Sequence, residues 1–387
     1  MKNLKQVSLL SICQSLMTSC NTLIVASSPL VGLQIATNKA LAALPLAILL
    51  LAGMFMSIPA AFLLQKFGRK KGFMTATSLG ISGGFFSFLG VYQTNFWIFI
   101  LGIMLVGMFN GFGNYYRMLA ADIVDINHKS KAIAFVILGG VFAAIIGPNI
   151  ASYTKDISTA PFAYSYGSIV ILHMLSFIFL SFLKIPEHMI GDEVDVNHNI
   201  ERNLKKIIVQ PNFILAILSA AIGYAVMAFI MTASPLAMDH YKHSFSSTSF
   251  VIQWHVMAMY APSLFTGSII NYLGVRKVIF IGVMLGFISI IINLEGISFL
   301  NFWWSMFLLG ISWNFMFVGG STLLSSTYHN LERAKVQAFN DFVVFSSAGL
   351  FSLLAGVIHF KFSWQIINIT AIPMLIIALI ALILTKK

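Results

Sequence analysis

The apolar residues of this chain fall into long blocks that are separated by short polar segments. An α-helix that crosses the hydrocarbon core of a bilayer needs about 20 consecutive residues, most of them apolar. Every block reaches that length or comes close to it, so each one predicts a transmembrane helix. The twelve predicted spans are residues 8–32, 40–64, 72–92, 96–121, 131–153, 162–183, 212–237, 249–271, 276–294, 302–326, 336–358 and 363–385.

The amino-acid composition indicates the same class of protein. Hydrophobic residues make up 58% of the 387 residues and charged residues only 9%, whereas a soluble domain carries roughly 25% charged residues. Lys2 and Lys5 precede the first block as they would in a signal peptide, but the apolar run continues to Gly32 and is too long for one. The chain is therefore predicted to be an all-α polytopic membrane protein.

The positions of the basic residues predict its orientation. The net charge is +11, and most Lys and Arg residues lie at the two ends of the chain and in alternate loops. The intervening loops hold only Lys39, Lys155, Lys242 and Lys361. Because positive charge gathers in cytoplasmic loops, we expect both termini in the cytoplasm. The short loops and a residue usage rich in Ile, Asn, Lys and Phe indicate a bacterial inner membrane.

The longest polar connection lies near the middle of the chain. Residues 184–211 hold five of the 12 acidic residues, which is typical of a solvated linker. It predicts an N-terminal six-helix bundle at residues 1–183 and a C-terminal six-helix bundle at residues 212–387.

The two halves repeat short motifs at a nearly constant interval. Ser28-Pro29-Leu30 in the first half recurs as Ser234-Pro235-Leu236 in the second, 206 residues later. Gly68 recurs at the same interval as Gly274, and each glycine is followed by a basic cluster. Several such matches in the same order indicate an internal duplication.

Two six-span repeats joined by a charged linker resemble the major facilitator superfamily, and the resemblance covers the whole chain. It implies twelve transmembrane helices in two pseudo-symmetric six-helix bundles. It also implies alternating access, in which two bundles rock around a solute site near the middle of the membrane.

The loop after the second span resembles the family's motif G-x-x-x-D-x-x-G-R-K/R. Gly68-Arg69-Lys70 matches the end of that motif, but Ala61 and Gln65 replace its first glycine and its acid. We expect Arg69 to pair with Asp122, at the end of the fourth span, and to hold one gate state. The alternative is that the basic cluster only fixes the topology.

Two charged residues lie within predicted spans. Arg117 is in the fourth span, and Asp341 is about two turns into the eleventh. A charge at the centre of a membrane helix costs about 2.5–3.5 kcal/mol on insertion scales, so such residues usually have a partner and a function. We hypothesise that Arg117 and Asp341 pair across the bundles and couple transport to protons. The alternative for Arg117 is a structural side chain that extends toward the interface.

Polar residues follow helical spacing in two spans. Thr18 and Asn21 share one face of the first span, and Asn110, Asn114 and Arg117 share one face of the fourth. The resemblance implies that spans one, four, seven and ten line the cavity. The expected lining is polar and cationic in the first half, and aromatic and rich in Met in the second. An alternative is that these polar residues only connect helices.

A cavity of this kind suits an amphipathic solute that is aromatic or anionic. We expect the solute to contact residues of both halves. We also expect contacts from Asn340, which is beside Asp341 in span eleven, and from Trp254 and His255 in span eight. The predicted solute-binding residues are Thr18, Asn21, Asn110, Asn114, Tyr116, Arg117, Tyr224, Met227, Trp254, His255, Asn314, Phe317 and Asn340.

These observations favour a proton-coupled secondary transporter. A membrane enzyme would need a nucleophile with a base, or metal ligands, and the chain offers no such set, so we predict no catalytic residues, no metal and no cofactor. The expected partners are a small solute, protons and the lipid bilayer, without nucleic acid, and the expected functional unit is a monomer.

Four short segments add a suggestion about the solute. They resemble a proteobacterial branch of the superfamily that includes proposed riboflavin importers, which implies uptake of a vitamin or a similar metabolite. A siderophore transporter and a multidrug/proton antiporter remain alternatives, and Gly147-Pro148 in the fifth span slightly favours export. The four segments are Tyr115–Asp122, Thr232–Met238, Val251–His255 and Ala338–Phe342.

Overall fold

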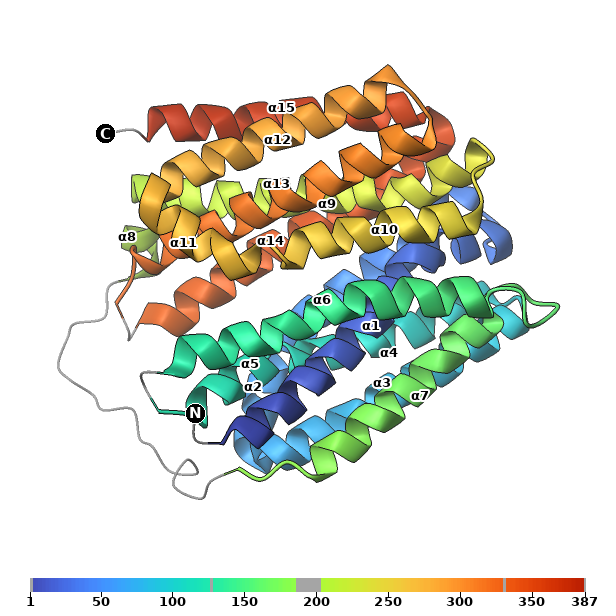
Figure 1. Cartoon of the computed structure of the whole chain (residues 1–387), viewed down its shortest axis with the longest axis horizontal. Coiled ribbons are helices and arrows are strands. Elements are labelled where there is room, and N and C mark those ends of the chain that lie inside the picture. Colours follow the sequence, from blue (N-terminus) through green and yellow to red (C-terminus); the bar gives the residue numbers. More distant parts are fainter. Residues whose placement is uncertain (1–2, 126–127, 186–202, 330–331, 386–387) are drawn as a thin grey trace. The chain divides into compact units, whose positions relative to one another are not determined.

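The computed structural model describes residues 3–125, 128–185, 203–329 and 332–385, and their regular secondary structure is entirely helical (Figure 1). Long helices account for most of it, as twelve apolar blocks predict. In the first half of the chain they are α1 (Leu4–Ile35), α2 (Leu44–Phe67), α3 (Arg69–Tyr92), α4 (Phe96–Gly113), α6 (Lys129–Thr154) and α7 (Ala163–Ser181).

The second half continues in the same way. Three short elements, η1 (Lys39–Leu41), α5 (Tyr116–Asp122) and α8 (Leu204–Ile208), complete the described secondary structure. The long helices of the second half are α9 (Pro211–His240), α10 (Phe245–Tyr260), α11 (Ser263–Leu273), α12 (Val275–Glu295), α13 (Phe299–Ser325), α14 (Arg333–Lys361) and α15 (Trp364–Leu384).

The eighth predicted span is not a single helix. Within the described residues, 11 helical segments are long and apolar enough to cross a membrane. The predicted span 249–271 is instead built from α10 and α11, which are separated by Ala261 and Pro262. Proline has no N–H to donate, and its ring clashes with the carbonyl four residues earlier, so it can kink or break a helix, and at Pro262 the helix is broken. The two helices together supply the eighth span.

The contacts between residues divide the chain into two units. The first unit is Met1–Glu193 with Ser244–Gln253, and the second is Val194–His243 with Trp254–Lys387. The beginning of α10 belongs to the first unit because it is hydrogen-bonded to α6. The Ser249 hydroxyl donates to the Pro148 carbonyl at 2.6 Å. Most of the predicted linker, residues 184–211, lies outside the described residues.

The backbone repeats itself at positions that the sequence repeat had matched. Gly68 joins α2 to α3 with φ 81° and ψ 145°, and Gly274 joins α11 to α12 with φ 87° and ψ 145°. They are the two glycines with positive φ in the described part of the chain. A residue with a Cβ rarely adopts this conformation. Both turns therefore require glycine for the same reason.

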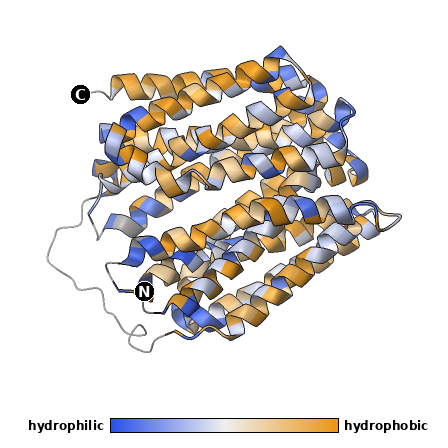
Figure 2. Ribbon diagram, in the orientation of Figure 1, coloured by the Kyte–Doolittle hydropathy of each residue, from blue (hydrophilic) through white to orange (hydrophobic). Residues whose placement is uncertain are grey.

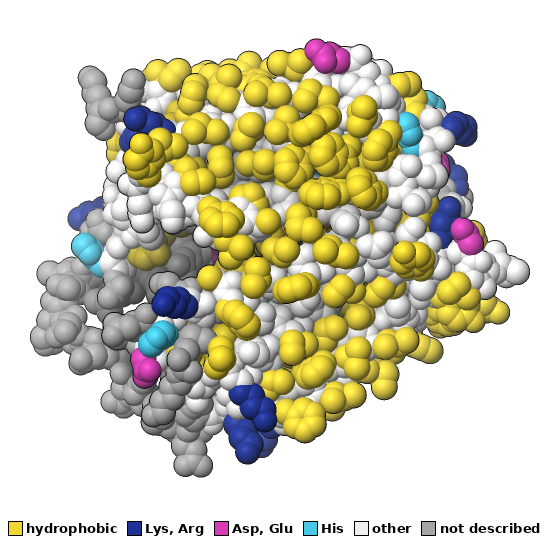
Figure 3. Space-filling model, in the orientation of Figure 1, with side chains coloured by type: hydrophobic (Ala, Val, Ile, Leu, Met, Phe, Trp, Pro, Cys, Tyr) yellow, Lys and Arg dark blue, Asp and Glu magenta, His cyan; other side chains and the backbone are white. Residues whose placement is uncertain are grey.

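Apolar side chains cover the outside of the helices. Phe55, Ile58 and Phe62 follow one face of α2 and are all more than half exposed. Figures 2 and 3 show hydrophobic residues over most of the visible face, with Lys and Arg toward the ends of the helices. A soluble monomer rarely exposes apolar patches of this extent. The surface instead suits contact with lipid, where helices satisfy their own backbone hydrogen bonds.

Candidate functional site

The turn after α2 contains the ion pair that the sequence predicted. Gly68 ends α2, and Arg69 is the first residue of α3. The Arg69 guanidinium lies 2.5 Å from the carboxylate of Asp122, the last residue of α5. The two side chains are 42% and 39% exposed. Exposed ion pairs contribute only about 0–1 kcal/mol, so this contact joins α3 to α5 without locking them together.

The turns at Gly68 and Gly274 are held by different contacts. The Lys70 ammonium donates to the Ser181 carbonyl, at the end of α7, at 2.6 Å. Arg276, 206 residues after Lys70, donates to Thr385 at 3.2 Å and to Asn212 at 2.8 Å. Val275 stands where Arg69 stands in the first turn. Arg276 therefore has neutral partners, whereas Arg69 has an acid.

Two of the predicted solute-binding residues of the first unit are in direct contact. The Asn110 amide on α4 donates to Asn21 Oδ1 on α1 at 2.8 Å. Both side chains are half-buried, and Asn110 Oδ1 has no hydrogen-bond partner among the described residues. Thr18 is buried one turn away and accepts a hydrogen bond from Gln14. Asn21 and Asn110 thus form an amide pair between α1 and α4 with acceptor capacity left over.

The predicted fourth span, 96–121, is interrupted. α4 ends at Gly113 and α5 begins at Tyr116, because the N–H of Tyr115 turns back to the Phe112 carbonyl three residues earlier. Asn114 and Arg117 are both exposed on either side of this break. The amide and guanidinium groups are therefore accessible, as a solute-binding role requires.

The structure places Tyr116 in the interior of the first unit. Its side chain is fully buried in the apolar core of the first unit, and its ring lies 4.8 Å from that of Phe73. Successive residues of a helix point about a quarter-turn apart. Tyr116 therefore faces the core while its neighbour Arg117 faces outward, and a contact between Tyr116 and solute stays a prediction.

The structure places Arg117 and Asp341 in different units, and their pairing stays a prediction. Asp341 is half-buried on α14. Its carboxylate accepts a hydrogen bond from the Asn340 amide at 3.0 Å, and Asn340 is itself buried. The predicted neighbours Asn340 and Asp341 are thus joined within the second unit.

The second unit contains a cluster of five aromatic rings from four helices, which we call the aromatic cluster. Trp313 and Phe317 on α13 are stacked, with centroids 5.0 Å apart and planes at 9°. Tyr224 on α9 meets them edge-on, at 5.4 Å from Trp313 and 5.7 Å from Phe317. Phe345 on α14 lies 5.5 Å from Tyr224, and Tyr260 on α10 lies 6.3 Å from Trp313.

The aromatic cluster is partly accessible. Tyr224, Tyr260, Phe317 and Phe345 are half-buried. Trp313 is only 6% exposed, and its indole N–H has no hydrogen-bond partner among the described residues. An unpaired buried N–H is costly, so it favours a site that is completed by another molecule.

Sequence reasoning found only part of this cluster. Tyr224 and Phe317 were predicted, whereas Trp313, Phe345 and Tyr260 were missed. The spacing of four between Trp313 and Phe317 places both rings on one helix face. That spacing is visible in the sequence, but it is equally typical of core packing, so it does not by itself indicate a site.

Asn314 was predicted to bind solute, which stays a prediction, and the structure gives it three hydrogen bonds within the second unit. Its side chain is fully buried. Its oxygen accepts from the Thr266 hydroxyl at 2.6 Å, and its amide donates to the Met259 carbonyl at 2.7 Å and to Ser263 Oγ at 2.6 Å. These partners lie on both sides of the α10–α11 break. Asn314 therefore replaces backbone hydrogen bonds that the break removes, and its amide is already committed.

Two further predictions for the second unit also meet buried side chains. Met227 is 2% exposed. His255 is fully buried, and its Nδ1 lies 2.7 Å from the Met306 carbonyl. Trp254 packs against Trp303 at 5.8 Å, in an aromatic group apart from the aromatic cluster. Met227 and His255 are core residues, because their faces of α9 and α10 are covered by neighbouring helices.

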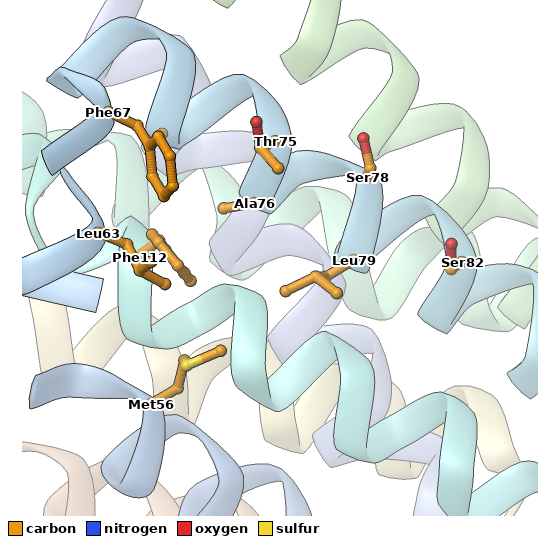
Figure 4. Close-up of a pocket in the computed structure, with 10 residues that line it drawn as sticks. Met56, Leu63, Phe67, Thr75, Ala76, Ser78, Leu79, Ser82 and Phe112 are labelled. Carbon is orange, nitrogen blue, oxygen red and sulfur yellow. The ribbon is translucent and has the colours of Figure 1, made fainter. Parts of the chain in front are cut away.

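A cavity of about 340 Å³ lies elsewhere in the first unit, between α2, α3 and α4 (Figure 4). None of the predicted solute-binding residues lines it, so it is distinct from the predicted solute site. Its lining residues are Met56, Leu63, Phe67, Gly72, Thr75, Ala76, Ser78, Leu79, Ser82 and Phe112.

Known proteins resemble this chain along its full length. The family model described as Major Facilitator Superfamily matches residues 8–259 and 215–387. The riboflavin transporter RfnT of Brucella anthropi is 34% identical over 384 residues, which covers 99% of this chain and 96% of that protein.

Solved structures show the same fold at low sequence identity. A D-xylose–proton symporter superposes with a TM-score of 0.76 at 12% identity, covering 99% of this chain and 97% of that one. The nucleoside transporter NupG gives a TM-score of 0.72 at 15% identity, covering 99% and 100%. The matching family model, the full-length relative and the twelve-helix fold together establish that this chain belongs to the major facilitator superfamily and is a secondary transporter.

Proposed function

We propose that this transporter imports a flat aromatic metabolite, with riboflavin as the first candidate, and that the proton gradient drives uptake. It acts in the bacterial inner membrane as a monomer with both termini in the cytoplasm. The aromatic cluster is the observation that carries the choice of solute. The full-length identity of 34% to a riboflavin transporter supports the same choice.

The aromatic cluster fits a fused-ring solute. Aromatic rings attract one another in stacked and edge-on arrangements, and a ring stacked on an aromatic side chain contributes about 1–3 kcal/mol per base in nucleic-acid complexes. The rings of Trp313 and Phe317 are stacked on each other, and Tyr224 packs edge-on against both. The free indole N–H of Trp313 is a donor for a ring carbonyl or nitrogen, both of which riboflavin carries.

The first unit supplies the chemistry that a hydroxylated side chain needs. Asn21 and Asn110 form an amide pair in which one oxygen lacks a protein partner, and Asn114 is exposed one turn along. Amides both donate to and accept from hydroxyl groups. Within the first unit, these amides can therefore hydrogen-bond the hydroxyl groups of a solute, and Arg117 can pair with an anionic group.

Proton coupling is assigned to Asp341. This carboxylate is half-buried within a membrane-spanning helix and is hydrogen-bonded to the buried Asn340. An acid in such surroundings changes its proton affinity when its neighbours move. In the proposed cycle Asp341 takes a proton in one state and yields it in the other, with Arg117 as the cation that competes for its charge.

The Arg69–Asp122 pair is assigned to the gate. It joins the start of α3 to the end of α5 through exposed side chains, and a contact of that kind can open and re-form without leaving a buried charge unpaired. We propose that it closes in one state of the transport cycle and is released in the other.

Uptake of labelled riboflavin by a riboflavin auxotroph tests the proposed function. We expect accumulation above the empty-vector control, and its loss with a protonophore. Lumichrome, which has the ring system without the ribityl chain, should compete for uptake, whereas ribitol should compete weakly. Absence of accumulation would exclude riboflavin, and siderophore uptake and dye efflux would then be measured with the same cells.

A further inference from the structure

The cavity between α2, α3 and α4 has apolar walls. Leu63 from α2, Leu79 from α3 and Phe112 from α4 form its sides. In Figure 4 the hydroxyl groups of Ser78 and Ser82 turn away from Leu79 and Phe112. The space therefore offers hydrocarbon contact and few hydrogen-bond partners. A vitamin or sugar would leave its polar groups unsatisfied there, whereas an acyl chain would not.

Two basic residues are next in sequence to residues that line this cavity. Lys66 precedes the lining residue Phe67, and Lys71 precedes the lining residue Gly72. Both lysines are exposed, and the Lys66 ammonium lies 5.6 Å from the Phe67 ring. Among the described residues, neither ammonium group has an ion pair or a hydrogen bond.

The other two basic residues of the turn are already engaged. Arg69 is paired with Asp122, and Lys70 donates to the Ser181 carbonyl. Lys66 and Lys71 are thus the positive charges that remain for another molecule. Lys71 lies in the first turn of the 24-residue helix α3, whose N-terminal dipole also favours a negative group, and Lys66 lies in the last turn of α2.

We propose that this cavity binds one anionic phospholipid, with an acyl chain between Leu63, Leu79 and Phe112 and the phosphate between Lys66 and Lys71. The apolar walls select a chain, and the two lysines select a negative headgroup. The site is independent of the proposed solute, because no predicted solute-binding residue lines it.

Native mass spectrometry of the full-length protein in detergent tests this site. Phosphatidylglycerol and phosphatidylcholine with the same acyl chains would be titrated against the wild type, K66Q/K71Q and the control K277Q. Lys277 is exposed at the position that corresponds to Lys71 in the other turn. Each juxtamembrane lysine is worth about fivefold in affinity for anionic lipid, so K66Q/K71Q should lower phosphatidylglycerol binding about thirtyfold. K277Q should leave it unchanged.

A second variant tests the cavity itself. Thr75 is exposed at the rim, so T75F should place a ring over the cavity without disturbing the core. It should weaken binding of phosphatidylglycerol while both lysines remain. Equal binding of the two lipids by the wild type would overturn the proposal. So would an equal loss in K277Q, or an affinity in T75F that matches the wild type. Riboflavin binding that T75F removes would show that the cavity holds solute instead of lipid, and would overturn it as well.

Discussion

The two units share a backbone plan but carry different chemistry at corresponding positions. Gly68 and Gly274 have nearly the same φ and ψ, and Pro29 and Pro235 lie inside the first helix of each unit. Thr18 on α1 corresponds to Tyr224 on α9, in the centre of the aromatic cluster. The glycine and proline positions that set the course of the backbone are the same in both units, whereas the predicted solute-binding positions Thr18 and Tyr224 differ.

The same contrast holds at the two turns. Arg69 pairs with an acid, whereas Arg276 is hydrogen-bonded to Asn212 and Thr385. A substitution that removes the charge of Asp122 would therefore break the ion pair of the first turn. Within the part of the chain that the structure describes, the second turn has no acidic partner of Arg276 that such a substitution could remove. The comparison suggests that the first unit provides the switchable contact and the second unit the fixed one.

The largest effect is expected at Asp341, because only the second unit supplies the proposed proton carrier. Asp341→Asn should abolish riboflavin accumulation driven by the proton gradient while leaving exchange of labelled for unlabelled solute in place. Uptake and counterflow in vesicles would measure both. Glu295→Gln, at the exposed end of α12, is the matched control and should behave as the wild type. Undiminished accumulation in the Asp341 variant would remove the coupling role.

The next effect is expected in the aromatic cluster. Trp313→Ala should raise the KM for riboflavin about tenfold, since the change removes the indole donor, worth about 0.5–1.5 kcal/mol as a hydrogen bond, and the ring that supports Phe317. Quenching of tryptophan fluorescence by riboflavin would report binding directly. Trp304, on the same helix but exposed, gives the control Trp304→Ala. If both variants bound riboflavin like the wild type, the cluster would be core packing only.

A symmetric effect is expected at the two glycine turns. Gly68→Ala and Gly274→Ala should each destabilise the protein by about 1–3 kcal/mol, because both positions have a backbone conformation that is nearly restricted to glycine. Gly267→Ala should have no such cost, since no atom lies near its added Cβ and its φ is not positive. Thermal unfolding in detergent would measure all three. Unequal losses at Gly68 and Gly274 would contradict the structural equivalence of the turns.

The smallest effect is expected at the ion pair. Asp122→Asn should slow transport by at most about fivefold, as exposed ion pairs are worth about 0.2–1 kcal/mol. The double variant Arg69→Asp/Asp122→Arg should recover part of the rate. Asn212→Asp, which gives Arg276 an acidic partner, should slow transport if a second charged contact impedes opening. Initial uptake rates would decide, and equal rates in all variants would leave the pair without a gating role.

The sequence predicted the features that depend on length and spacing. The apolar blocks predicted the helices, and the repeat predicted that the two glycine turns correspond. The basic turn motif predicted the Arg69–Asp122 pair. Each of these follows from local chemistry or from a match at one fixed interval, which does not require knowledge of which helix packs against which.

The sequence could not show which polar side chains are buried by neighbouring helices. Asn314 was expected to face solute, but its three hydrogen bonds go to groups on α10 and α11. Tyr116 was expected to face solute, but the break before it turns its ring onto Phe73. Hydropathy gives the same value to a polar group that a neighbouring helix satisfies and to one that is open to solute. The Pro262 break could not be predicted from the proline alone, because Pro29 and Pro235 lie inside continuous helices.

The break at Pro262 also decides how many times the chain crosses the bilayer. α10 has 16 residues and α11 has 11, which correspond to lengths of about 24 Å and about 16 Å. Neither length alone covers the hydrocarbon core of about 30 Å, but the two together do. A scheme that counts only unbroken helices therefore reaches an odd number and assigns the two ends of the chain to opposite compartments. If the 11 residues of α11 complete the eighth span, a reporter fused to the C-terminus should lie on the same side of the membrane as the N-terminus.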